Sequence, residues 1–412
     1  MAHITKKQYL FCPGPVNVAE NIKQAVVENE IGHREAEFVS LMLRLREKLL
    51  KFFEVKNTNA YFPIVITGSG TAANETVFSS LGNPSVLVLT NGEFGNRLFE
   101  ISKLHNKRTY KLDFDWGRPI EVKKVEAFLK KKKIGVIAMV HHETSIGILN
   151  PAAKIGALAK KYKALFVMDA VSSAGAEKID LEKWHISFCT TSSSKAIGSL
   201  PGLSLVIGKT TEFEKLKDVP VKVMYLNLYK FYHYAKTIAQ TPNTPAVQLF
   251  FAIEQAITNI LREGVEKRRK KVSELSTQLR TGLKKMGFQF LIDEASMSNT
   301  LTTVKLPEFL DITTLQRYLK SKGIIVYNGK GPFKDKVFQV ANIGEVNKLD
   351  IMIFLDVMKT LIQTLTLQPA LVRKTKKILP YAKAEALLPN KSVNMPQQKG
   401  LPFRQLSANK PN

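Results

Sequence analysis

The sequence predicts an α/β fold in which a mostly parallel sheet is covered by helices and followed by a smaller α+β unit. From about residue 19 to residue 208, amphipathic helical patterns alternate with short apolar runs, as in a sheet wound by crossover helices. The short runs lack the polar alternation of strands that face water, so we expect them to be buried on both faces. Beyond about residue 245, long helical patterns and a second group of short strands replace this alternation.

The clearest helical pattern covers residues 37–53, where apolar side chains repeat at helical spacing and should form one buried stripe. These side chains are Phe38, Leu41, Met42, Leu45, Leu49 and Phe52. Three apolar runs, at residues 85–89, 134–140 and 165–168, are predicted to be parallel core strands. Each is followed by a polar segment: NGEFGNR from Asn91, HHETSIG from His141 and DAVSSAG from Asp169. Because ligands bind at the carboxyl ends of such strands, we expect these segments to share a cleft.

The C-terminal part of the sequence predicts strands at residues 289–292, 300–305, 324–327 and 337–340, with helices at 312–322 and 349–365. We therefore predict an N-terminal arm (1–18), a large domain (19–260), a small α+β domain (261–368) and a tail (369–412). The tail contains nine Lys or Arg residues and one acidic residue, Glu385, together with six of the 18 prolines. This composition predicts disorder.

The overall charge is strongly positive. The 412 residues include 61 Lys and Arg against 35 Asp and Glu, a formal charge of +26, which permits attraction to phosphates, nucleic acid or an anionic membrane. Two cysteines, Cys12 and Cys189, are too few for a disulfide framework and favour a reducing compartment, so we expect the cytoplasm. No stretch approaches the roughly 20 apolar residues of a membrane span.

Lys195 lies in the segment CTTSSSKAIGSLPGLSLVIG, which spans residues 189–208. Small polar neighbours at a strand end leave room for a flat ring, so one interpretation is a lysine that forms a Schiff base with pyridoxal phosphate. The competing interpretation is a solvated surface lysine, because long charged side chains are mostly exposed.

Asp169 ends the apolar run LFVMD, 26 residues before Lys195. A carboxylate at that sheet edge would pair with a pyridine nitrogen and keep it protonated, which lets the ring withdraw electrons from a substrate carbanion. The alternative is an aspartate that caps a following helix or turn.

The stretch TGSGTAANETVFSSL, from Thr67, resembles a phosphate-binding turn before a helix. Its glycines permit close backbone approach, its hydroxyls can bond a phosphate, and the helix N-terminus supplies N–H groups. The spacings of a Walker loop and of the dinucleotide fingerprint are both absent, which argues against an ATPase or a dehydrogenase.

Phe94, between glycines of NGEFGNR, could stack on a cofactor ring or simply pack in a loop.

Taken together, these segments resemble the class V aminotransferases of the fold-type I pyridoxal-phosphate superfamily, in particular the 2-aminoethylphosphonate:pyruvate and alanine:glyoxylate aminotransferases. The resemblance covers about residues 10–362. It rests on the segments PGPVNV, GHREAEF, TGSGTAANE, NGEFGNR, HHETSIGILNP, MDAVSSAGAEKID, SSSKAIGSLPG and NIGEV in this order.

The resemblance implies a role for each matching residue. Lys195 would form the Schiff base and Asp169 would pair with the pyridine nitrogen. The remaining cofactor contacts would be Val171 and Phe94 on the two ring faces, Thr144 at the ring hydroxyl, and Ser69, Gly70, Thr71 and Ser194 at the phosphate. Thr241, in QTPNTP, would reach the phosphate of the partner subunit, which implies a homodimer with shared sites. Gly14 and the residue at position 339 would contact the substrate.

The sequence departs from the family at Gln339, where relatives usually carry an arginine that clamps the substrate carboxylate. An amide supplies no charge, and losing a charge-assisted pair costs about 1.5–3 kcal/mol of binding. Lys330, Lys334 or Lys336, just upstream, could supply the missing charge, or they could form a solvated basic loop.

The histidines His33, His141 and His142 have no metal-ligand spacing, and we predict no metal site.

The leading hypothesis is an aminotransferase that moves an amino group from a small amine, 2-aminoethylphosphonate or alanine, to a 2-oxo acid such as pyruvate or glyoxylate. A second hypothesis, prompted by Gln339, is a lyase or another repurposed relative with the same cofactor. A third is a basic protein that binds nucleic acid or a membrane through the tail and the run at 130–133; the sequence contains no recognition motif for it.

Overall fold

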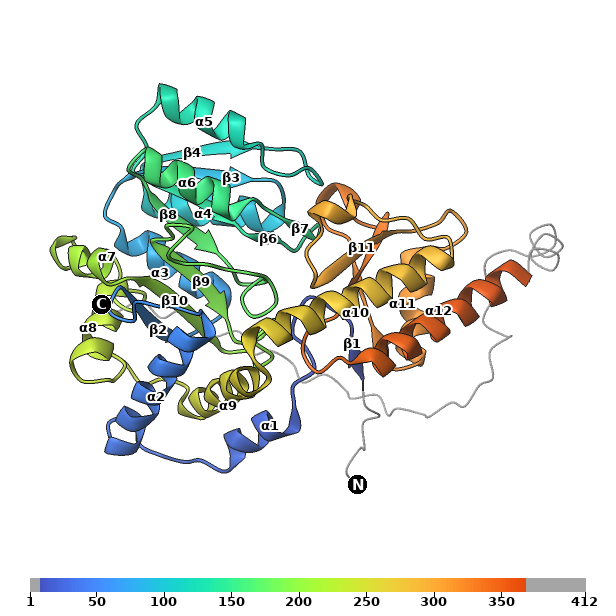
Figure 1. Ribbon diagram of the computed structural model, residues 1–412, viewed down its shortest axis with the longest axis horizontal. Coiled ribbons are helices and arrows are strands. Elements are labelled where there is room, and N and C mark those ends of the chain that lie inside the picture. The colour runs from blue at the N-terminus through green and yellow to red at the C-terminus, as the bar shows by residue number, and fades with distance from the viewer. Residues whose placement is uncertain (1–7, 368–412) are drawn as a thin grey trace, which may run out of the picture. The chain divides into compact units, whose positions relative to one another are not determined.

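The computed structural model describes residues 8–367, and a seven-stranded sheet is the largest sheet among them (left half of Figure 1). The strand order is β2-β10-β9-β8-β5-β3-β4. Strand β10 runs antiparallel to both of its neighbours, and the other pairs are parallel. The strands are β2 (Tyr61–Thr67), β3 (Ser85–Thr90), β4 (Arg108–Asp113), β5 (Val136–Val140), β8 (Leu165–Asp169), β9 (Phe188–Ser192) and β10 (Leu203–Lys209). The predicted mostly parallel α/β sheet is confirmed, and its three apolar runs are β3, β5 and β8.

Helices precede, connect and follow these strands, and the sequence pattern explains which face they bury. In α2 the buried side chains include all six that the helical spacing predicts. The helices are α1 (Glu20–Val27), α2 (Ala36–Phe52), α3 (Gly70–Ser80), α4 (Glu93–His105), α5 (Val122–Lys131), α6 (Ala152–Lys161), α7 (Thr210–Lys215), α8 (Leu228–Thr237), α9 (Val247–Glu263), α10 (Val265–Lys285), α11 (Ile312–Ser321) and α12 (Lys348–Leu367).

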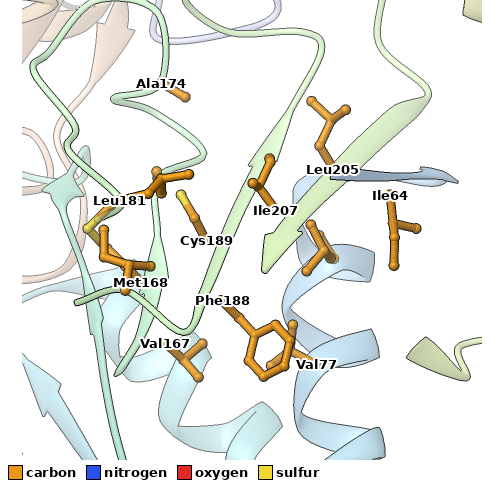
Figure 2. Packing of buried hydrophobic residues seen from close by; sticks show 14 of the residues in the cluster. Ile64, Val77, Val167, Met168, Ala174, Leu181, Phe188, Cys189, Leu205 and Ile207 are labelled. Atoms are coloured by element: carbon orange, nitrogen blue, oxygen red, sulfur yellow. The ribbon is translucent and has the colours of Figure 1, made fainter. Parts of the chain in front are cut away.

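The main core lies between the sheet and helices α1 to α9. Figure 2 shows part of it, where Val77 of α3 lies beside Phe188 of β9. Strands β5, β8 and β9 are almost completely buried along their lengths, as expected for parallel strands covered on both faces. This rigid core fixes the carboxyl ends of the strands, from which the polar segments emerge.

The C-terminal part contains a three-stranded sheet in the order β11-β14-β13, formed by β11 (Leu301–Lys305), β13 (Tyr327–Asn328) and β14 (Val337–Ala341). The predicted strand at residues 289–292 is wrong: only Phe290 makes a bridge, to Val304, before the chain turns into a short 3-10 helix, Glu294–Ser296. The predicted strand at 324–327 is divided in two at Val326, into β12 (Ile324–Ile325) and β13.

The N-terminal segment pairs with this C-terminal part. Strand β1 (Tyr9–Leu10) lies parallel to β12, and the N–H of Ala341 donates to the carbonyl of Phe11. The next residues form a turn that contains a cis peptide bond between Gly14 and Pro15. Two small hairpin strands, β6 (His142–Glu143) and β7 (Ile148–Leu149), lie in the segment after β5.

Residues 8–361 belong to one compact unit. The proposed boundaries at residues 18 and 260 within it stay predictions, and the predicted tail, 369–412, lies outside the described residues. Within residues 8–367, no helix is long and apolar enough to cross a membrane.

Candidate active site

A cavity of about 280 Å³ lies at the carboxyl edge of the parallel strands. It brings together ten residues that the sequence singles out: Gly14, Ser69, Gly70, Thr71, Phe94, Thr144, Asp169, Val171, Ser194 and Lys195. These residues come from segments spread over much of the chain, and the topology places their strand ends side by side. The expected shared cleft is therefore present.

Lys195 follows β9 in the turn that leads back to β10. Its Nζ donates a hydrogen bond of 2.8 Å to the carbonyl of Pro13. Burial lowers the pKa of this amine, the positive charges of Lys330 and Arg97 lower it further, and Cys12 and Asp169 oppose the change. A larger fraction of the amine is therefore neutral near neutral pH than for an exposed lysine.

Gly14 lies directly against this lysine. A Cβ at position 14 would be 2.5 Å from the lysine Nζ, and the φ of +129° also disfavours any other residue. The glycine thus lets the N-terminal turn approach the reactive amine.

Asp169, at the end of β8, is buried and held by two hydrogen bonds. The N–H of Val171 donates to Oδ1 at 2.8 Å, and Nδ2 of Asn74 donates to Oδ2 at 2.7 Å. Burial raises the pKa of the carboxyl group, and these hydrogen bonds oppose the rise. A cation next to the carboxylate, such as a protonated pyridine nitrogen, would favour its ionised form.

The N-terminus of α3 forms a cradle on another side of the cavity. Ser69 is the N-cap, its hydroxyl makes no capping bond, and Gly70 and Thr71 begin the helix. A Cβ on Gly70 would be only 2.6 Å from a methyl carbon of Val171, so a glycine is needed for the backbone to lie there. Free N–H groups and hydroxyls at a helix N-terminus suit a phosphate.

The segment after β5 holds the first turn of α4, which carries Phe94. The buried carboxylate of Glu143 accepts hydrogen bonds from the N–H groups of Phe94 (3.2 Å) and Gly95 (2.8 Å). The hydroxyl of Ser145 accepts one from the N–H of Glu93 at 3.0 Å. Between them, Thr144 donates to the hydroxyl of Ser172 at 2.6 Å. The segment at residues 143–145 therefore carries Thr144 and also fixes the position of the helix turn that carries Phe94.

The other two predicted site residues lie outside the cavity lining. Gln339 is buried in β14, and its Nε2 donates to the carbonyls of Thr144 (2.9 Å) and Ser145 (3.1 Å). Thr241 is also buried, and its hydroxyl donates to the carbonyl of Asn243 at 2.8 Å. Whether Thr241 meets the site of a second subunit stays a prediction.

The sequence interpretation missed Asn74, which lines the cavity. Its Oδ1 accepts a hydrogen bond of 2.5 Å from Thr190, so its amide is oriented to donate to Asp169. The available signal was its position, one helical turn after Gly70, which puts both on the same face of α3. Arg97, one turn after Phe94, also lines the cavity and was missed.

The two adjacent histidines have different surroundings. The Nδ1 of His141 lies 3.0 Å from the hydroxyl of Ser173, and its ring packs against Trp184. His142 lines the cavity, and its Nε2 is buried with no partner among the described residues. Burial lowers the pKa of His141 to about 3 and that of His142 to about 4. In residues 8–367, no group of three or more His, Cys, Asp or Glu side chains could hold a metal ion.

These features fit pyridoxal phosphate. The cavity contains the amine of Lys195, the buried carboxylate of Asp169 whose hydrogen bonds come from neutral donors, and the helix N-terminus at Gly70, where a Cβ would collide with Val171. It also contains a buried nitrogen of His142 with no partner among the described residues. The individual residue roles remain predictions.

Comparison with known proteins gives consistent matches. The sequence model of the family described as "Aminotransferase class-V" matches residues 18–335. An uncharacterized aminotransferase of Methanocaldococcus jannaschii is 33% identical over 351 residues, which cover 84% of this chain and 90% of that protein. The 2-aminoethylphosphonate–pyruvate transaminase of Bacteroides fragilis is 29% identical, over 86% of this chain and 99% of its own. The crystal structure of alanine–glyoxylate aminotransferase from a Nostoc species superimposes with a TM-score of 0.83 at 25% identity, over 88% of this chain and 97% of that one.

Proposed function

Since this chain belongs to the class V aminotransferases, and is thus a pyridoxal-phosphate-dependent aminotransferase of fold type I, we propose which amino group it moves. The donor is a small amine, 2-aminoethylphosphonate or alanine, and the acceptor is pyruvate or glyoxylate. The relatives named above support these substrates. The observation that carries the proposal is the convergence of Lys195, Asp169 and the α3 cradle on one cavity.

Each cavity residue has a proposed task. Ser69, Gly70 and Thr71 bind the phosphate, with Ser194 nearby, and Phe94 and Val171 flank the ring. When bound, pyridoxal phosphate withdraws electrons from the substrate carbon that bears the amino group. Asp169 would hold the ring nitrogen in its protonated form, and Thr144 would hydrogen-bond to the ring hydroxyl. Gly14 lies at the substrate side, next to Lys195.

The proton transfer belongs to Lys195. A partly buried amine with a lowered pKa can accept a proton at Nζ near neutral pH and return it, as a general base must. The carbonyl of Pro13, 2.8 Å away, orients this nitrogen. No histidine is required for this step.

Replacement of the lysine tests the proposal. Purified wild-type enzyme loaded with pyridoxal phosphate is expected to show the visible absorption of cofactor joined to Lys195, and 2-aminoethylphosphonate or alanine should convert it to the pyridoxamine form. Lys195→Ala should lack both properties, whereas the exposed-lysine control Lys154→Ala should keep them. A wild-type protein that takes up no pyridoxal phosphate would contradict the proposal.

A second candidate is a lyase with the same cofactor, favoured by the uncharged Gln339. In that case an amine donor releases product while the cofactor stays in its aldehyde form. The same spectroscopic experiment distinguishes the two reactions.

We also propose a homodimer with shared sites and a cytoplasmic location. The dimer would place Thr241 at the partner subunit's phosphate, because Thr241 lies outside the cavity of its own chain. The location rests on the two unpaired cysteines, Cys12 and Cys189.

A further inference from the structure

Two cationic side chains lie against the ring of Phe94, and one of them, Arg97, also lines the cavity. The Cζ of Arg97 is 5.0 Å from the centroid of the Phe94 ring, and the Nζ of Lys330 is 4.8 Å from it. Arg97 is one turn along α4, whereas Lys330 comes from the segment after β13. Both charges are close enough to Lys195 to lower the pKa of its amine.

These cations have little negative charge to balance them. The nearest carboxylate oxygen to Arg97 belongs to Glu93, at 3.7 Å, and both side chains are more than 40% exposed, so this pair is weak. Within residues 8–367, no carboxylate forms an ion pair with Lys330. Asp169, the acidic residue of the cavity lining, is close enough to Arg97 for the two charges to interact, but it makes its hydrogen bonds with Asn74 and Val171 and no ion pair with Arg97.

Gln339 is not available to bind the anionic group of a substrate. Both N–H groups of Gln339 are directed at protein acceptors: the carbonyls of Thr144 and Ser145, with the hydroxyl of Thr303 at 3.3 Å. The side chain is 1% exposed. It fixes the backbone of the segment that holds Phe94, so it acts as a positioning residue.

The residues proposed to bind the cofactor phosphate, Ser69, Gly70 and Thr71, belong to the N-terminus of α3 and not to the segments that carry Arg97 and Lys330. The excess positive charge beside Phe94 is therefore left for another anion. A guanidinium and an ammonium together suit a small oxyanion, since the first offers paired donors and the second a compact charge.

We propose that Arg97 and Lys330 form the subsite for the anionic group of the substrate, a phosphonate or a carboxylate, in place of a charged side chain at position 339. This inference rests on the proposed function. The subsite favours small amines and oxo acids that carry an oxyanion over neutral amines of the same size.

Equilibrium binding to the holoenzyme tests the subsite without any turnover. Methylphosphonate and acetate, which cannot be transaminated, are titrated by calorimetry into wild-type enzyme and into Lys330→Met and Arg97→Met. We expect each substitution to weaken binding by about tenfold, the value of one charge-assisted contact. Lys330→Arg should retain most of the affinity, and Lys334→Met, an exposed lysine of the same segment, should match the wild type.

The outcomes separate the two proposals. If neither anion binds the wild-type holoenzyme, or if both Met variants bind them as tightly as the wild type does, the subsite is wrong. A preference between methylphosphonate and acetate shows which oxyanion the subsite suits. If anions bind as expected but no amine donor converts the cofactor, the subsite stands and the aminotransferase substrates proposed above are wrong. Retained visible absorption in the Met variants confirms that they are folded and loaded.

Discussion

Asn74 is the side chain that orients the buried carboxylate of Asp169. It donates at 2.7 Å to Asp169 and accepts at 2.5 Å from Thr190, so its amide has one orientation. Asn74→Ala removes a hydrogen bond to a charged group, which contributes about 1.5–3 kcal/mol. We expect the affinity for pyridoxal phosphate to fall by about one to two decades, measured by titrating the apoenzyme and following visible absorption.

A matched control separates this effect from a general loss of stability. Asn21 makes its amide contact with Asn259 on an exposed surface. Asn21→Ala should bind the cofactor as the wild type does. Equal weakening in both variants would show that the Asn74 contact to Asp169 has no specific effect on cofactor binding.

The two buried histidines should make the fold sensitive to acid. Burial lowers the pKa of His142 to about 4 and that of His141 to about 3, below the ordinary value near 6.5. Between pH 6.5 and 4 the unfolded chain therefore binds more protons than the native one, and stability falls as the pH falls. Each histidine should contribute a loss of about 2 kcal/mol at pH 5 relative to pH 7.

Urea unfolding of the holoenzyme at pH 7 and pH 5 measures this loss. His142→Asn should show a smaller difference between the two midpoints than the wild type. His233→Asn, at an exposed position, should keep the wild-type difference. An unchanged pH dependence in His142→Asn would contradict the assignment of a neutral, buried imidazole.

At the residue scale, the sequence predicts those side chains that stand in recognisable segments. Lys195, Asp169 and Gly70 each lie in a polar segment after an apolar run, and the cavity contains all three. The surroundings of Gln339 and Lys330 were not predictable, because they depend on contacts between segments about 190 to 240 positions apart, such as Gln339 with Thr144 and Lys330 with Phe94. Periodicity and spacing carry no information on such contacts.

At the scale of single elements, the N-terminus of α3 is the proposed binding site of the cofactor phosphate, and its first residue leaves no room for a side chain. In Gly70→Ala the new Cβ would be 2.6 Å from a methyl carbon of Val171, which also lines the cavity. We expect the displaced valine and helix start to weaken pyridoxal phosphate binding by about tenfold or more, measured by the same titration.

Gly135→Ala is the matched control for this substitution. Its Cβ would make an ordinary contact of 3.4 Å with Pro84, away from the cavity. This variant should bind the cofactor normally. If Gly70→Ala also binds it normally, the α3 turn does not hold the phosphate.

Elements with a strong apolar pattern were predictable, whereas segments that depend on a single pairing partner were not. The helix α2 follows from apolar side chains at helical spacing, and the strands β3, β5 and β8 follow from continuous apolar runs, because burial on one face or on both faces imposes these patterns. The segment at residues 289–292 has the same composition as a strand but lies beside β11 with a single bridge, at Phe290. Whether such a segment forms a strand depends on the strand that lies beside it, and the tertiary fold determines which strand that is.

At the scale of the whole molecule, the proposed dimer can be tested by mixing inactive subunits. Lys195→Ala removes the reactive amine of its own site, whereas Thr241→Ala would damage the site of the partner. A hybrid dimer of the two variants would therefore have one intact site and one that carries both changes. We expect subunit exchange between the two inactive proteins to restore activity, measured as pyruvate-dependent turnover of the donor.

Two controls complete this experiment. Each variant mixed with itself should stay inactive, and native mass spectrometry of subunits that carry tags of different mass should show that hybrid dimers have formed. If hybrids form without activity, the two residues serve the same chain's site and the shared-site arrangement is wrong.

The pairing of β1 with β12 has a consequence for the order of folding. Tyr9 pairs with Ile324, so the first described strand finds its partner only after most of the chain has been made. Closing so long a loop is slow, because the conformational entropy that it costs is offset only when the distant contact forms. The turn that carries Pro13 to Lys195 is fixed by the same pairing. We therefore expect the reactive amine to gain its final surroundings only after β12 has been synthesised and has paired with β1.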